Sequence, residues 1–109
     1  MHEMAVMMGV VDQVTERLGD ARIAEVSLTV GKLSGVVPDS LRFCFELACA
    51  GTALEGAELD IDEPAGQAEC RSCALQFTVD QPFLLCPCGS ADIQVIGGQE
   101  LLIRSVKVA

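Results

Sequence analysis

The sequence predicts an α+β fold, in which two helices pack on a small three-stranded sheet and a cysteine-rich module is inserted before the last strand. Three observations support this prediction. Two stretches have the apolar spacing of amphipathic helices, three stretches alternate apolar and polar residues as strands do, and two cysteine pairs lie close together in the remaining segment. At 109 residues the chain is long enough to bury one core.

The first helix is expected to run from Met4 to Gly19. Its apolar residues recur at helical spacing, while polar and charged residues occupy the opposite face. Methionines at this spacing fill a core far more often than they ligate a metal, because the side chain is flexible and apolar. Met4, Met7 and Met8 are therefore expected in the core.

The remaining elements of the domain follow from similar patterns. A strand is expected within residues 21–31, and a second helix from Pro38 to Gly51, because proline suits the first helical turn. Alternating residues predict a second strand over 58–62. The last strand, 101–108, is expected to return and pair with the first two strands.

The α+β domain is expected to comprise residues 1–65 and 98–109, and the inserted module residues 66–97. Proline and glycine mark both connections between them, at Pro64-Ala65-Gly66 and Gly97-Gly98. These two connections are expected to serve as hinges.

Cys70, Cys73, Cys86 and Cys88 predict a four-thiolate metal site in a zinc-ribbon-like module. Each pair lies on a tight turn that can aim both sulfurs in one direction, and four thiolates suit structural zinc. The residues between the pairs are expected to form a two-stranded ribbon that includes Phe83 and has too little apolar surface to fold without metal. A disulfide pair or an iron–thiolate centre is the alternative.

The other two cysteines, Cys44 and Cys49, are expected to be buried, inert thiols. They are five residues apart on the second helix, so they project about 140° away from each other and do not readily share a metal.

The charge of the chain disfavours nucleic acid as a partner. Acidic residues outnumber basic residues by 16 to 7, and the formal net charge is −9. Binding to nucleic acid depends mainly on the neutralisation of phosphates by basic side chains. An acidic surface suits a cation carrier or a basic protein partner, although simple solubility is the more ordinary explanation.

The apolar run from Met4 to Val11 predicts neither a signal peptide nor a membrane span. It lacks a basic flank and a small-residue cleavage site, and spanning a bilayer takes about 20 apolar residues. A cytoplasmic location without membrane contact is expected. Thiols stay reduced there, so paired cysteines more often hold a metal than each other.

Met1-His2-Glu3 offers a second metal site. Met1 is expected to persist as the terminus, because the initiator methionine is normally removed only before a small residue. Its amine, the backbone nitrogen of His2 and the His2 imidazole can close fused chelate rings, with Glu3 as a further ligand. Nitrogen donors in a plane suit Ni²⁺ or Cu²⁺. The residues alone favour the alternative, an ordinary solvated chain start.

Further motifs join these two sites. Val30-Gly31 ends the first strand, Phe43-x-Phe45-Glu46 lies in the second helix, and Gly98-x-Glu100-Leu101 opens the last strand. Together with the N-terminal triplet and the cysteine pairs, they resemble the HypA/HybF family of hydrogenase maturation nickel metallochaperones, essentially from end to end. The chain departs from the family at Cys86-Pro87-Cys88, where members usually have one residue between the proline and the second cysteine.

The resemblance implies that Met1, His2 and Glu3 bind Ni²⁺ as cargo and that the four cysteines of the module hold a structural Zn²⁺. It also implies delivery of nickel, with a HypB-like maturation GTPase, to the large-subunit precursor of a [NiFe]-hydrogenase. Urease is a further client to consider.

No residues suggest catalysis, because the chain has no spare histidine, glycine-rich phosphate loop or nucleophile elbow. A non-enzymatic metal carrier is therefore expected. A rubredoxin-like electron carrier and a zinc-ribbon interaction module without nickel are the alternatives, and metal analysis distinguishes all three.

Overall fold

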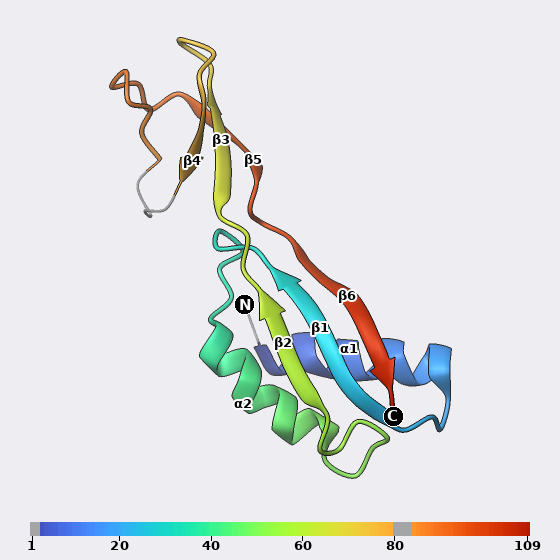
Figure 1. Ribbon diagram of the computed structural model, residues 1–109. Coiled ribbons are helices and arrows are strands. Elements are labelled where there is room, and N and C mark those ends of the chain that lie inside the picture. The colour runs from blue at the N-terminus through green and yellow to red at the C-terminus, as the bar shows by residue number, and fades with distance from the viewer. Residues whose placement is uncertain (1–2, 80–83) are drawn as a thin grey trace.

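The computed structural model describes residues 3–79 and 84–109, which form two helices and two small sheets (Figure 1). In chain order the elements are α1 (Glu3–Leu18), β1 (Ile23–Val30), α2 (Pro38–Cys49), β2 (Glu58–Asp62), β3 (Gly66–Cys70), β4 (Gln76–Val79), β5 (Ile93–Gly97) and β6 (Leu101–Val108). The predicted α+β class is confirmed. None of the helices in the described residues is long and apolar enough to cross a membrane.

The first sheet has the order β2-β1-β6. β2 runs parallel to β1, because α2 carries the chain back across the sheet between them, and β6 is antiparallel to β1. The expectation that the last strand pairs with both earlier strands is wrong for β2. The parallel β1-α2-β2 unit places β1 in the centre, so β6 reaches only the free edge of β1.

Both helices contribute to one core on a single face of this sheet. The core residues from α1 are the stripe Met7, Val10, Val11 and Val14. They pack with Val26, Leu28 and Val30 of β1 and with Leu41 and Phe45 of α2. Met7 is fully buried as predicted, but Met4 is half-buried and Met8 is 56% exposed, because Met8 lies outside the stripe.

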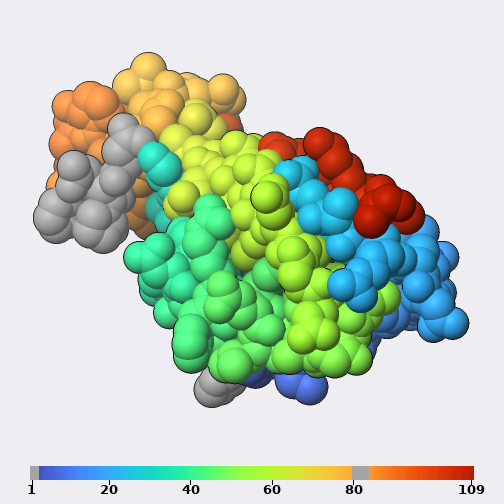
Figure 2. All heavy atoms as spheres, turned by 60° about the horizontal axis from the view of Figure 1, so that its bottom comes forward, coloured from blue at the N-terminus to red at the C-terminus, as the bar shows by residue number. Residues whose placement is uncertain are grey.

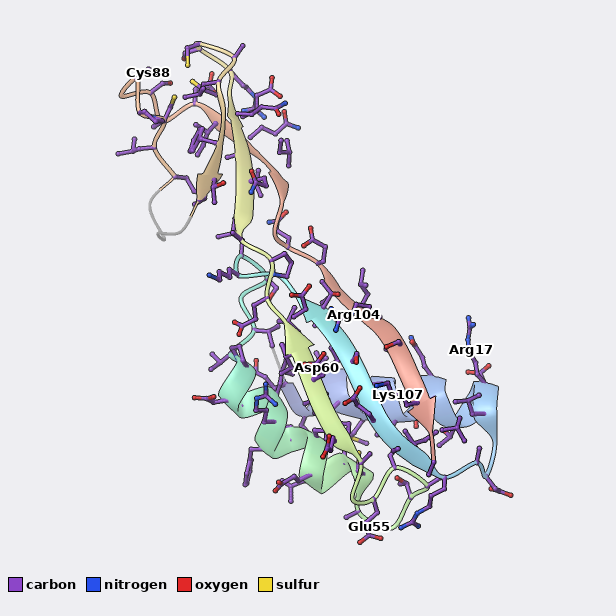
Figure 3. All side chains as sticks on the ribbon, in the orientation of Figure 1. Arg17, Glu55, Asp60, Cys88, Arg104 and Lys107 are labelled. Carbon is purple, nitrogen blue, oxygen red and sulfur yellow. The ribbon has the colours of Figure 1, made fainter. Side chains whose placement is uncertain are left out.

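The opposite face of the sheet is open to solvent and charged. Arg104 of β6 pairs with Asp60 at 2.7 Å (Figure 3). It also pairs with Asp62 at 3.5 Å, and Lys107 pairs with Glu25 at 3.6 Å. These ion pairs are exposed, so they contribute little to stability.

The second sheet has the order β4-β3-β5, and both pairings are antiparallel. β4 therefore pairs with β3, a strand that ends at the first cysteine of the first pair. The prediction of a two-stranded ribbon formed between the two cysteine pairs is wrong for the described residues. Phe83, which was expected in that ribbon, lies outside them. β3 was not predicted, since its sequence buries only Gly66, Ala68 and Cys70 and shows little apolar alternation.

The loop after β1 joins the two sheets. Backbone amides donate from Gly31 to Glu100 at 2.7 Å, from Lys32 to Pro64 at 2.9 Å and from Leu33 to Gly98 at 2.8 Å. One loop is thus bonded to both connections, which limits how freely they bend. The molecule as a whole is elongated, with extents of 53 × 20 × 18 Å.

Candidate metal centre

Four cysteine sulfurs converge at the end of the second sheet, and Cys88, which provides one of them, lies far from the helices (Figure 3). Cys70 is the last residue of β3, and Cys73 follows on the next turn. Cys86 and Cys88 lie on a turn before β5. The Sγ atoms of Cys70 and Cys88 are 3.8 Å apart, those of Cys73 and Cys86 are 3.5 Å apart, and all four lie within 4.8 Å of one another.

These separations fit one tetrahedral metal ion. Metal–sulfur bonds of about 2.3 Å in a tetrahedron place the sulfurs about 3.8 Å apart. A disulfide requires the sulfurs to be about 2.05 Å apart, and all the described cysteines are free. The arrangement therefore favours a four-thiolate metal site over disulfide pairing. Zinc and iron both suit such a site.

The short Cys-x-Cys spacing is accommodated by a tighter version of the first turn. In the first turn, the Cys70 amide donates to the Leu75 carbonyl at 2.9 Å, and the Ala74 amide donates to the Cys70 carbonyl at 2.8 Å. In the second turn, the Cys86 amide donates to Ser90 at 2.9 Å, and the Gly89 amide donates back to Cys86 at 2.8 Å. Each hydrogen bond of the second turn thus spans one residue fewer than its counterpart in the first turn.

The same local geometry recurs at the sulfurs and in the backbone. The Cys73 amide donates to Cys70 Sγ, and the Cys88 amide donates to Cys86 Sγ, both at 3.4 Å. Each turn also contains one residue with positive φ, Ala74 at 64° and Gly89 at 93°. Glycine adopts this conformation without steric cost, which suits the tighter turn. The second pair can therefore present two sulfurs despite its missing residue.

Residues outside the ligand set hold the two turns together. The hydroxyls of Ser72 and Ser90 are 2.9 Å apart, the Arg71 amide donates to the Asp92 carbonyl at 2.9 Å, and the Arg71 side chain pairs with the Asp92 carboxylate at 3.2 Å. Sequence reasoning missed these four residues. Only their closeness to the cysteines in the sequence could have identified them, because they belong to no apolar or motif pattern.

The thiols of Cys70 and Cys86 differ in pKa. The Cys73 amide lowers the pKa of Cys70 to about 6, although burial opposes the shift. The pKa of Cys86 is lowered by the Cys88 amide, but burial and the neighbouring thiols outweigh this effect and raise it to about 12. One ligand therefore ionises readily, whereas a cation must displace the proton of another, so metal binding releases protons.

The remaining predicted site residues lie elsewhere. Met1 and His2, the first two members of the predicted nickel triplet, lie outside the described residues, and half-buried Glu3 begins α1. Among the described residues, the four cysteines are the only group of three or more metal-ligating side chains. Cys49 is buried as predicted, whereas Cys44 is only half-buried.

Comparisons with known proteins find relatives along essentially the whole chain. The family model described as "Hydrogenase/urease nickel incorporation, metallochaperone, hypA" matches residues 1–108. The "Hydrogenase maturation factor HypA" of Streptomyces avermitilis is 52% identical over 112 residues, which cover 97% of this chain and 86% of that protein. Its counterpart from Chlorobium limicola is 46% identical over 112 residues, which cover 99% of this chain and 97% of that protein.

A solved structure shares the fold. The solution structure of the Ni metallochaperone HypA from Helicobacter pylori matches with a TM-score of 0.65 and 20% identity, covering 99% of this chain and 97% of that chain. At this identity the likeness speaks for the fold alone. The family consists of metallochaperones, so the prediction of a non-enzymatic protein is confirmed. With its fold, its cysteine cluster and its end-to-end match, the chain belongs to the HypA family of hydrogenase maturation metallochaperones.

Proposed function

We propose that this chain carries Ni²⁺ on its N-terminal residues and delivers it during the maturation of a [NiFe]-hydrogenase, while its cysteine cluster holds a structural Zn²⁺. The observation that carries this proposal is the match of residues 1–108 to a family of nickel-incorporation metallochaperones. The client assignment follows the names of the relatives, which are hydrogenase maturation factors. Urease is the second client, because the family description includes it.

Met1, His2 and Glu3 are the proposed nickel ligands. The Met1 amine, the His2 backbone nitrogen and the His2 imidazole form the nitrogen-rich donor set that Ni²⁺ prefers, and Glu3 supplies an oxygen. Glu3 is the first residue of α1, which packs into the core through Met7 and Val10. The triplet is thereby attached to a fixed helix.

Cys70, Cys73, Cys86 and Cys88 are the proposed zinc ligands. Four thiolates complete a tetrahedral shell and leave no open position, which is the property of a structural site and not of a site that exchanges cargo. Buried Cys70 and Cys86 support a retained ion. We assign residues 66–97 to this module and residues 1–65 and 98–109 to the nickel-binding domain.

The proposed partners are a HypB-like maturation GTPase and the large-subunit precursor of the hydrogenase, in the cytoplasm. The chain transfers a metal ion and forms no covalent intermediate, so its chemistry is ligand exchange.

The test compares two versions of the protein, one with a Gly-Ser extension before Met1 and one with the same extension after Ala109. The N-terminal extension converts the amine into an amide, whose lone pair is delocalised, without changing any side chain. We expect nickel affinity, measured by calorimetry, to fall by about tenfold or more only with the N-terminal extension. Zinc content should remain one ion per chain in both versions.

Equal nickel affinity in the two versions would exclude the amine as a ligand. His2→Ala should abolish specific nickel binding, and wild-type affinity should decline as the pH falls through about 6.5, where a free imidazole becomes protonated. Strong visible absorption by the protein as isolated would indicate an iron–thiolate centre in place of zinc.

A further inference from the structure

The outer edge of β6 is a long, open strand edge. β6 pairs on one side with β1, and in the part of the chain that the structure describes no strand pairs with its other side. All eight residues of Leu101–Val108 lie along this edge. An exposed edge of this length is a template for pairing with another chain, and proteins normally shorten or cover such edges.

The opposite edge of the same sheet shows how an edge is covered. β2 has only five residues, and the Arg42 guanidinium of α2 donates to the Leu59 carbonyl at 2.9 Å. This side chain occupies a backbone acceptor of β2. The two edges of one sheet therefore differ, because β2 is short and partly capped whereas β6 is long and uncapped.

An apolar groove accompanies the open edge. α1 crosses behind the sheet and continues past β6 (Figure 1), and the space between them is a groove of about 580 Å³ lined on α1 by Val14 and Leu18 and on β6 by Leu102 and Val106. A second hollow of about 240 Å³, also lined by Leu102, lies against Val6 and Val10. In Figure 2 the red spheres of β6 lie at the surface of the molecule. The part of α1 that continues past β6 therefore lies behind the position that a further strand would occupy.

Basic residues lie on both faces of the β6 edge in a chain of net charge −9. Arg17 lines the groove and projects from the part of α1 beyond β6, while Arg104 and Lys107 lie on β6 itself (Figure 3). These are three of only seven basic residues. Arg17 forms no ion pair within the described residues, and the pairs of the other two are exposed.

We propose that this edge binds an extended, acidic segment of a partner protein, which adds to β6 as a fourth strand. Alternate side chains of a strand point to opposite faces. The apolar side chains of such a segment would fill the groove against Leu18 and Val106, and its carboxylates would point to the other face of the sheet, where Arg104 and Lys107 lie. Hydrogen bonds between the two backbones supply the affinity, and the alternation of apolar and acidic side chains supplies the selectivity.

A second copy of this chain is a poorer occupant. Pairing two β6 strands would bring together Arg17, Arg104 and Lys107 from both copies, and like charges on neighbouring strands are destabilising.

The probe is a fluorescein-labelled peptide of alternating valine and glutamate, as long as β6, and its control is the valine–lysine peptide. With full-length, zinc-loaded protein we expect anisotropy to show a dissociation constant below about 100 μM for the acidic peptide and binding weaker by about tenfold or more for the basic one. Hydrogen exchange should slow at β6 amides and not at β2.

Two variants and one matched control locate the site. Arg17→Glu and Leu18→Glu alter exposed side chains that line the groove, and each should weaken binding by about tenfold. Lys32→Glu makes the same charge change as Arg17→Glu at an exposed residue beside the junction, and it should leave binding within about twofold. Circular dichroism checks that all three fold.

Several results would overturn the proposal. These are no binding of the acidic peptide at about 1 mM, equal binding of both peptides, or equal effects of Arg17→Glu and Lys32→Glu. A dimer seen by sedimentation that Leu18→Glu dissociates would also overturn it, because the groove would then belong to a second copy.

Discussion

The two sheets of this molecule are stabilised by different means. The β2-β1-β6 sheet is covered by two helices and contributes to a core that includes fully buried Met7, Leu41 and Leu54. Among the described residues, the β4-β3-β5 region buries few apolar or sulfur-bearing side chains beyond Ala68, Val79 and two cysteines of the metal cluster. A small sheet without a helix cover needs another source of stability.

Magnitudes show why a metal can replace a core. Burying one aliphatic side chain contributes about 1.5–3 kcal/mol. Binding of a structural zinc contributes about 10–16 kcal/mol in small zinc-finger peptides near neutral pH. A single ion in the cysteine cluster thus equals several core residues, and the following predictions test whether the two regions are independent.

The largest effect is expected for Cys70→Ala. The substitution removes one of four ligands from a region with almost no core, so the metal should be lost and residues 66–97 should become disordered. Amide resonances of β1 should keep their dispersion in a two-dimensional NMR spectrum. Cys44→Ala, outside the cluster, is the control and should retain the metal. Collapse of the β1 resonances in Cys70→Ala would contradict independent regions.

The converse change is Leu41→Ala in the domain core. Leu41 is fully buried, so the cavity should lower the free energy of unfolding by about 2–5 kcal/mol in urea. Metal content should stay at one ion per chain. Phe43→Ala, on the same helix but 64% exposed, should change stability by only about 0.5 kcal/mol. Loss of metal from folded Leu41→Ala protein would show that the two regions depend on each other.

Gly98→Ala tests the junction between the two sheets. Gly98 has φ of 91°, and a Cβ there would overlap the backbone of Gly66, so we expect a loss of about 1–3 kcal/mol. Residual dipolar couplings should also report altered alignment of one sheet relative to the other. Gly9→Ala has open space within α1 and should stabilise the protein by up to about 1 kcal/mol. Unchanged couplings in Gly98→Ala would mean that the junction does not fix the alignment.

The smallest effect concerns Cys49, and it appears only in alkaline solution. Burial raises the pKa of this thiol from 9.0 to about 11. As the pH rises, the unfolded chain therefore loses the Cys49 proton before the folded chain does. The contribution of this thiol to the free energy of unfolding is fully present below pH 9 and is lost as the pH rises through about 11. Wild type should lose stability more steeply than Cys49→Ala over this range. Parallel curves would contradict the burial effect.

Sequence reasoning succeeded where the signal was periodic or chemical. The apolar stripe predicted α1, alternation predicted β1, and the cysteine spacing predicted the cluster that the structure assembles. Pro38 correctly predicted the start of α2.

It failed where stability comes from geometry that leaves no local pattern. β3 carries only Gly66, Ala68 and Cys70 on its buried face, and its place in the centre of a sheet depends on pairing with β4 and β5. The tighter second turn was also beyond prediction, because its closure relies on backbone hydrogen bonds around Gly89. The bonds between the loop after β1 and Pro64 and Gly98 are likewise tertiary.

The pairing of β1 with β6 has a consequence for biosynthesis. β6 is translated after the cysteine module, although its partner β1 is translated well before it. Contacts between distant segments form late, whereas the two cysteine turns and the strands around them close over short separations. On the ribosome the module can therefore acquire its metal while β1 still has an unpaired edge. The domain that flanks the module in the sequence is completed after it in time.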